Sequence, residues 1–151
     1  MIYVKIYLYF LEVIKMSKEE NVVKFYVLCN KLKDTVRTGW KDWHVNRKRV
    51  ESIAEHIFGV QMLAIAMQSE YKYDIDISKV ILMLAVHELE EIYIGDLTLF
   101  QISQEEKLKM GHEAVCKVLK DLVKKNEILA LINEFDEKQT KEAKFATFVT
   151  N

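Results

Sequence analysis

Apolar and polar residues along this chain follow the period of an α-helix rather than that of a β-strand. From residue 18 to residue 33, apolar side chains recur every three or four positions, which is the spacing of a helix with one buried face. Comparable stripes follow over 53–67, 78–93, 103–125, 127–135 and 140–149. These patterns predict an all-α single domain of five to six helices packed around one core.

Side-chain caps mark where several of these helices begin. Ser52 is followed three residues later by Glu55, and Ser103 by Glu106, and each pair has the spacing of a capping box. The other expected boundaries are Asp76 or Ser78 at the start of the third helix, Tyr93 at its end, and Thr140 as the cap of the last. The expected buried positions are Val22, Val23, Phe25, Tyr26, Leu28, Leu32, Ile53, Ile57, Val60, Leu63, Ala64, Met67, Leu108, Val115, Val118, Leu119 and Leu122.

The composition narrows the class of protein. Half of the 151 residues are hydrophobic and the net charge is −1, so the chain offers no electrostatic reason to bind nucleic acid or an anionic membrane. It has no proline and only four glycines, so long helices can run with little interruption. Cys29 and Cys116 lie far apart inside helical patterns, and we expect them to be buried, reduced thiols in a cytoplasmic protein.

The first fifteen residues differ from the rest of the chain. They are rich in β-branched and aromatic residues, but the apolar run is too short and too interrupted by charge to cross a bilayer. No small-residue cleavage site follows, which argues against a signal peptide. We interpret residues 1–15 as a non-native or accessory N-terminal extension and residues 16–151 as the domain.

The connection from residue 34 to residue 50 concentrates tryptophan and arginine. Its chemistry-bearing residues are Arg37, Trp40, Trp43, His44, Arg47 and Arg49. That density in a connection indicates a loop that contacts a ligand or a partner. An equally weighted alternative is that Trp40 and Trp43 simply cap the helical bundle.

The stretch 85–98 carries the densest polar chemistry, directly after an apolar run. His87 and Glu91 are four residues apart and would share one face of a helix, with Glu88 beside that face. A second histidine, His56, falls early in the helix that follows the first capping box. One histidine there is more often a satisfied core residue than a ligand, but two imidazoles and a carboxylate suit a divalent metal. A zinc-protease HExxH motif is excluded, because position 91 is glutamate.

Five short motifs resemble, in order, those of the HD-domain metal-dependent phosphohydrolases, and most closely the 5'-deoxynucleotidase group. They are RTGW at 37–40, ESIAEH at 51–56, VHELEE at 86–91, GD at 95–96 and EAKF at 142–145. The resemblance covers most of the chain from about Asn21 onward. It implies an HD-domain helical bundle, a divalent metal ion (Mn, Co, Fe, Ni, Zn or Mg) and hydrolysis of (deoxy)nucleoside 5'-monophosphates to nucleoside and phosphate. It also implies that the protein forms a homodimer and that its substrate is a small-molecule nucleotide.

The same resemblance assigns roles by position. The metal ligands are His56, His87 and Glu88, the catalytic glutamate is Glu91, and the substrate contacts are Arg37, Trp40 and Asp96. We therefore expect His56 and His87 to approach each other from separate helices. Glu91 would take the proton from an attacking water.

Two positions depart from the family's pattern. Glu88 stands where the family has aspartate, which adds one methylene and roughly 1.5 Å of reach, and the family's last aspartate ligand falls near Thr150. The family continues with a helix where this chain stops, so we expect a domain cut short at its C-terminal helix or a degenerate site. One fewer anionic ligand predicts weak metal retention and low or absent phosphatase activity. The alternative function is a degenerate, non-catalytic HD domain that binds a nucleotide or a protein partner.

Overall fold

The computed structural model describes residues 17–42, 48–97 and 102–150, and its regular structure in these ranges is helical apart from one isolated β-bridge. The elements are α2 (Lys18–Cys29), the 3-10 helix η1 (Asn30–Lys33), α3 (Gly39–Asp42), α4 (Ile53–Tyr71), α5 (Ile77–Val86), α6 (Glu91–Ile94), α7 (Gln104–Leu119), α8 (Lys125–Glu137) and α9 (Lys141–Thr150). Six of these helices span ten or more residues, which confirms the predicted all-α domain of five to six helices. None of the helices in the described ranges is long and apolar enough to cross a membrane. The proposed extension at 1–15, together with Trp43, His44 and Arg47, lies outside the described residues.

The predicted helix starts form as the side chains indicated. Both capping boxes are present, at Ser52 before α4 and at Ser103 before α7. Asp76 rather than Ser78 caps α5, and its carboxylate accepts two backbone N–H groups. Thr140 accepts a backbone N–H at the start of α9. Local polar groups therefore fix where these four helices begin.

The third predicted helix ends earlier than expected, because α5 stops at Val86 and not at Tyr93, and α6 begins at Glu91. The Nδ1 atom of His87 lies 2.8 Å from the carbonyl oxygen of Leu84, the acceptor that a continuing helix would offer to residue 88. The N–H groups of residues 89, 91 and 92 then bond carbonyls three positions back. The prediction of one continuous helix is wrong, and tight turns present the polar cluster instead.

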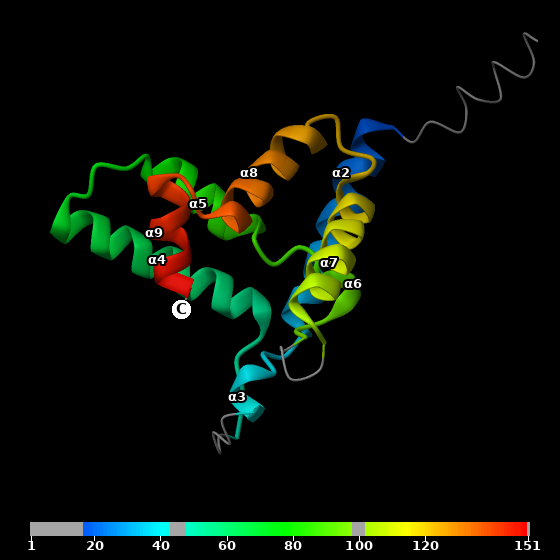
Figure 1. The fold of residues 1–151 in the computed structure, drawn as a ribbon. Helices are drawn as coiled ribbons and strands as arrows, with labels where there is room; N and C mark the ends of the chain where they lie inside the picture. Colours follow the sequence, from blue (N-terminus) through cyan, green and yellow to red (C-terminus); the bar gives the residue numbers. More distant parts are fainter. Residues whose placement is uncertain (1–16, 43–47, 98–101, 151) are drawn as a thin grey trace, which may run out of the picture.

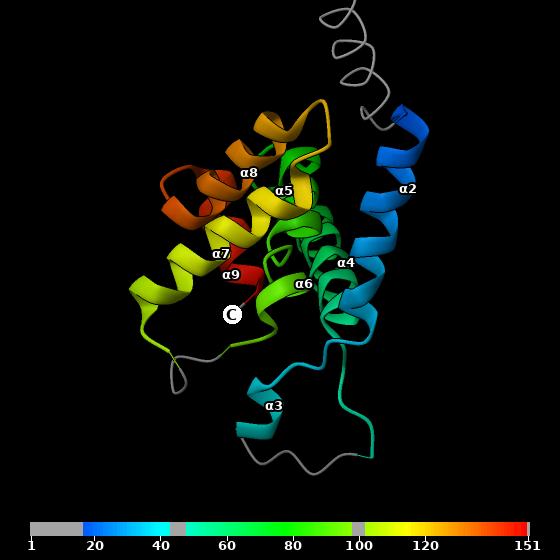
Figure 2. The same ribbon diagram turned by 90° about the vertical axis from the view of Figure 1, so that its right-hand side faces the viewer.

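Buried side chains form two clusters. The first core lies among α4, α5 and α9 and consists of Val60, Ala64, Val80, Met83, Leu84, Ala143, Phe145, Ala146 and Val149. The second core lies around α7 and consists of Leu32, Ile53, Leu89, Ile92, Val115, Val118, Leu119 and Ile132. Figure 1 shows α4, α5 and α9 on one side of the molecule and α2, α6 and α7 on the other, and Figure 2 gives the turned view.

Both motif histidines lie at the boundary between these cores. Along α4, His56 stands between Ile53 of the second core and Val60 of the first. His87 likewise follows Leu84 of the first core and precedes residue 89 of the second. The site is therefore built where the two packing units meet.

Several expected core positions are exposed. They are Val22, Val23, Tyr26, Leu63 and Leu108. In α2 the reason is that the helix packs mainly against η1 and α7, so that Phe25, Leu28 and Cys29 are the residues of α2 that pack against the second core. Cys116 is exposed and Cys29 half-buried, so the prediction of buried thiols is wrong for Cys116, although both are free.

A short backbone clasp joins residues 35–37 to residues 51–53. The N–H of Ile53 donates to the carbonyl of Thr35 at 2.8 Å, and the N–H of Arg37 donates to the carbonyl of Glu51 at 3.1 Å. Residues 36 and 52 pair between them as an antiparallel bridge. The clasp holds Arg37 beside the first turn of α4, which carries His56.

Candidate metal centre

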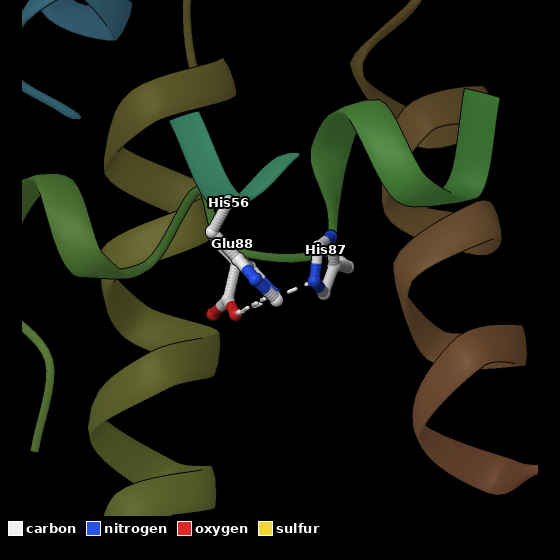
Figure 3. A group of neighbouring side chains, drawn as sticks. All are labelled: His56, His87 and Glu88. Carbon is white, nitrogen blue, oxygen red and sulfur yellow. Dashed lines mark ion pairs between the residues drawn. The ribbon is translucent and has the colours of Figure 1, made fainter. Parts of the chain in front are cut away.

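Two histidines and one glutamate converge at the boundary of the two cores. His56 reaches this point from the first turn of α4, whereas His87 and Glu88 come from the turn after α5 (Figure 3). Glu88 Oε1 lies 3.3 Å from His87 Nε2 and 3.9 Å from His56 Nε2. One donor atom from each of the three residues lies within 4.8 Å of the others. The structure thus brings together the three ligands that the resemblance implied.

Each imidazole is approached on its Nδ1 side by an acceptor outside the cluster. His87 Nδ1 donates to the carbonyl of Leu84, and His56 Nδ1 lies 3.8 Å from Glu51 Oε1. The contact with Leu84 places a proton on Nδ1 of His87, and in both rings the Nε2 atom is the one that faces Glu88. Both Nε2 atoms are buried without a hydrogen-bond partner of good geometry, which is costly unless a cation or proton is bound there. This donor set fits a divalent metal ion.

The metal-free cluster distributes its charge unevenly. Burial, assisted by the charge of Arg37, lowers the pKa of His56 to about 4, so this ring is neutral at pH 7. Burial also disfavours the charged form of His87, but the adjacent Glu88 outweighs it and raises the pKa of His87. Burial acts to raise the pKa of Glu88, yet His87 and Arg37 prevail and lower it to about 2. Glu88 thus favours a proton on His87, and a metal ion would compete with that proton.

Glu91 stands beside Glu88 at the start of α6. Its side chain is buried and its Oε2 atom has no hydrogen-bond partner. Burial, together with the charges of Glu88 and Asp96, raises the pKa of Glu91 to about 10. Glu91 is therefore protonated in the metal-free protein, and cationic charge that offsets Glu88 would favour its ionised form.

These groups line one cavity of 290 Å³, which also reaches Arg37 and Asp96. The Nη1 atom of Arg37 lies 3.5 Å from Glu88 Oε1, and its Nε atom is buried with no hydrogen-bond partner among the described residues. An arginine with an unused buried donor beside a candidate metal site suits an anionic group such as phosphate.

Asp96 and Trp40 serve as anchors around this cavity. Asp96 Oδ2 accepts the N–H of Thr38 at 2.6 Å, and so fixes the segment that carries Arg37. The indole of Trp40 is 38% exposed and donates to Glu51 Oε1 at 3.0 Å, outside the cavity lining. The structure thus brings Arg37 and Asp96 to the ligand cluster but leaves Trp40 one residue removed from it.

Further polar groups of the cavity escaped the sequence reasoning. Lys107 and Lys138 line it, and no local pattern indicated either. Glu90 also lines it, and burial, followed by the charge of Glu88, raises the pKa of Glu90 to about 7. Glu90 also lies beside Gly111 of α7, where an added Cβ would make an ordinary van der Waals contact of 3.5 Å with Glu90 Cγ.

Thr150 lies at the end of α9 and lines the same cavity. Its hydroxyl donates to the carbonyl of Thr147 at 3.0 Å. The position at which the family pattern expects a last aspartate is therefore part of the site, and it carries a hydroxyl there.

Comparison with known proteins decides the family. A model of the HD domain matches residues 29–150, which is most of the chain. The chain belongs to the HD-domain family. This confirms the resemblance that the five motifs indicated and agrees with an all-helical fold built around the histidine cluster.

Relatives and solved structures extend the same result. The chain is 31% identical over 131 residues to "5'-deoxynucleotidase HDDC2" of Dictyostelium discoideum, covering 82% of this chain and 68% of that protein. It is 30% identical to "5'-deoxynucleotidase hdd1" of Schizosaccharomyces pombe, covering 85% of this chain and 66% of the relative. The chain thus spans about two thirds of the length of these relatives. The PH0347 protein of Pyrococcus horikoshii OT3 superposes with a TM-score of 0.70 at 27% identity, over 85% of this chain and 71% of that one. A predicted metal-dependent phosphohydrolase from Magnetospirillum magnetotacticum MS-1 shares the fold, with a TM-score of 0.74 at 24% identity over 89% and 67% of the two chains.

Proposed function

We propose that this HD-domain chain is a metal-dependent phosphomonoesterase that hydrolyses (deoxy)nucleoside 5'-monophosphates to nucleoside and phosphate. The observation that carries the proposal is the pair of buried, unpaired Nε2 atoms of His56 and His87 facing Glu88, with Arg37 beside them. Similarity to relatives named 5'-deoxynucleotidases supports the substrate class. His56, His87 and Glu88 would hold the divalent ion, one of Mn, Co, Fe, Ni, Zn or Mg.

Each polar residue of the cavity has a separate role in the proposed reaction. A divalent ion in the cluster would supply Lewis-acid polarisation of a phosphate oxygen and a water of lowered pKa. Arg37 offers its unused Nε donor to the phosphate, and Asp96 holds the segment of Arg37 in place through Thr38. Glu91 takes the proton of the attacking water, because offsetting the charge of Glu88 removes a main cause of its raised pKa. Asp96 is assigned to a substrate contact and Trp40 to the region near the sugar and phosphate, as the resemblance implied.

The second candidate is a non-catalytic HD domain that binds a nucleotide or a protein partner. It is favoured by one observation, the hydroxyl of Thr150 where the family pattern has a carboxylate ligand. With one fewer anionic oxygen, a hard divalent ion is held less tightly. We therefore expect weak metal retention and slow turnover in the unmodified chain.

One experiment separates the two candidates. Metal content of the purified protein is measured together with phosphate release from a panel of ribonucleoside and deoxynucleoside 5'-monophosphates, with 3'-monophosphates as the negative control. Thr150→Asp is expected to raise metal affinity and turnover, whereas His112→Ala, an exposed position outside the cavity, should change neither. Phosphate release that is absent with and without added metal, in both the unmodified chain and Thr150→Asp, would leave the non-catalytic candidate standing.

We also propose that the chain acts as a homodimer in the cytoplasm. Exposed Phe58, Met62 and Ile65 of α4 and Leu82 of α5 form an apolar face suited to a second copy, and both thiols are free. Sedimentation equilibrium is expected to give twice the mass of one chain for the unmodified protein. The Met62→Lys variant is expected to give the mass of a single chain. A monomer at high micromolar concentration would contradict this assembly.

A further inference from the structure

The side chain of Glu51 lies between the metal-ligand cluster and the segment of Arg37 and Trp40. One oxygen, Oε1, accepts the indole N–H of Trp40 at 3.0 Å and stands 3.8 Å from His56 Nδ1. The backbone carbonyl of the same residue accepts the N–H of Arg37 at 3.1 Å. A single residue therefore contacts a predicted metal ligand, a predicted phosphate contact and an aromatic residue outside the cavity lining.

The position of Glu51 is set by the fold rather than by its own side chain. The clasp of residues 35–37 with 51–53 fixes its backbone, and the capping box at Ser52 fixes the start of α4 one residue later. His56 follows in the first turn of that helix. The carboxylate thus has a defined place on the Nδ1 side of the ring, opposite to the Nε2 atom that faces Glu88.

Two acceptors compete for the ring proton of neutral His56. Glu51 lies on the Nδ1 side and Glu88 on the Nε2 side, at 3.8 Å and 3.9 Å. Glu88 faces the guanidinium of Arg37 at 3.5 Å, whereas in the described part of the chain no lysine or arginine forms an ion pair with Glu51. The proton therefore belongs on Nδ1, and the Nε2 lone pair is left for a cation.

We propose that Glu51 is a positioning residue that fixes the Nδ1–H form of His56 and couples metal occupancy to the order of the Arg37–Trp40 segment. The coupling to metal occupancy rests on the proposed function, whereas the Nδ1–H form of His56 does not depend on it. A metal ion bound at Nε2 would make the Nδ1–H of His56 a stronger donor, and the His56–Glu51 contact would then tighten. Because Trp40 shares the same oxygen, its environment changes with it, and by linkage any loss of the Trp40 contact alters metal affinity in return.

The first test uses the metal-free protein and needs no activity. Nitrogen-15 NMR of the histidine rings at pH 8 distinguishes the Nδ1–H from the Nε2–H form. We expect wild-type His56 to be Nδ1–H and Glu51→Ala to shift it toward Nε2–H, since the remaining acceptor is Glu88. A wild-type His56 already in the Nε2–H form, or one unaffected by Glu51→Ala, overturns the proposal. Circular dichroism confirms that each variant is folded.

The second test measures Zn²⁺ binding by calorimetry and by tryptophan fluorescence. Zn²⁺ is chosen because it has no unpaired electrons that would quench the fluorescence. Glu51→Gln keeps an oxygen acceptor for Trp40 but loses the charge that orients His56, and should weaken Zn²⁺ binding roughly 10- to 100-fold. Glu70→Gln, an exposed carboxylate near the other end of α4, is the matched control and should bind as wild type. In a Trp43→Phe background, where Trp40 is the single tryptophan, Zn²⁺ should shift the emission of the wild-type site, and Glu51→Ala should abolish the shift.

The two proposals fail in different ways. Equal Zn²⁺ affinity for wild type and Glu51→Gln, or an emission shift that persists in Glu51→Ala, removes Glu51 from its positioning role. Absence of Zn²⁺ and Mn²⁺ binding in wild type contradicts the proposed function instead, and the tautomer measurement still decides the role of Glu51.

Discussion

The two segments that supply the histidines hold them in different ways, one at the start of a helix and the other at the end of a helix. Residues 51–56 place His56 at the start of a helix, where a backbone clasp and a capping box fix the first turn. Residues 84–91 place His87 at the end of a helix. There its ring donates a hydrogen bond to the Leu84 carbonyl, and the backbone no longer forms α-helical hydrogen bonds. A helix start held by its cap leaves the ligand side chain free, whereas at the break the ligand helps to shape the backbone.

The largest expected effect comes from removing either ligand. His56→Ala and His87→Ala should each weaken divalent-metal binding by at least roughly 100-fold, because loss of an outer-shell partner alone costs 10- to 100-fold. Both truncations leave a cavity, but His87→Ala should destabilise the fold more, by roughly 2–4 kcal/mol in all, because it also removes the hydrogen bond to Leu84. Calorimetry and urea denaturation measure the two effects. Equal loss of stability in both variants would erase the contrast.

The next effect concerns Glu91, which lies just after the break. Glu91→Gln should keep metal and nucleotide binding but lower turnover by roughly 100-fold or more, as loss of a general base does. Glu55→Gln, an acidic residue in the capping box of α4, is the control on the other segment and should leave the chemical step unchanged. Turnover of Glu91→Gln at the wild-type rate would remove this side chain from the mechanism.

The pH dependence of the metal-free protein should separate the two imidazoles. The folded pKa of His56 is about 4, below its ordinary value of 6.5, so stability is lost as pH falls from about 6.5 toward 4, by up to about 3 kcal/mol. The folded pKa of His87 is raised, so its contribution is fully present below pH 6.5 and is lost as pH rises through that raised value. NMR titration of the two rings checks the order. A His56 that titrates above His87 would contradict it.

The smallest effect tests the start of α4. Ser52→Ala should cost about 1 kcal/mol of unfolding free energy through loss of the N-cap, and should loosen metal binding only slightly. Ser69→Ala, at an exposed position of the same helix, is the control and should be nearly neutral. A loss in Ser52→Ala no greater than in Ser69→Ala would mean that the clasp alone holds this turn.

The sequence predicted the starts of helices better than their ends. Ser52, Ser103 and Thr140 act within three or four residues, so their effect is visible in the local sequence. The end of α5 depends on a rotamer of His87 that reaches back to Leu84, and hydrophobic periodicity carries no trace of it. Val22 and Val23 have helical spacing but no partner in the described fold, because burial depends on which helices pack together.

The site residues show the same division. The motif positions His56, His87, Glu88, Glu91, Arg37 and Asp96 meet in one cavity, as the resemblance to a known family implied. Lys107 and Lys138 reach the cavity from α7 and from the end of α8, by tertiary packing alone. Glu90 lines the same cavity, and its place there also depends on how the turn after α5 packs.

The boundary between the two cores gives the histidine pair a mechanical role as well as a chemical one. A cation bound to both imidazoles would link α4 to the turn after α5 at the boundary of the two cores, where both Nε2 atoms are buried without a hydrogen-bond partner in the described structure. Binding that is specific to the folded state stabilises it by RT ln(1 + [L]/Kd), about 2.7 kcal/mol at a hundredfold excess over Kd. The free energy of unfolding would then depend on the metal concentration. Melting curves recorded at increasing metal concentration should show a higher melting temperature and a narrower transition.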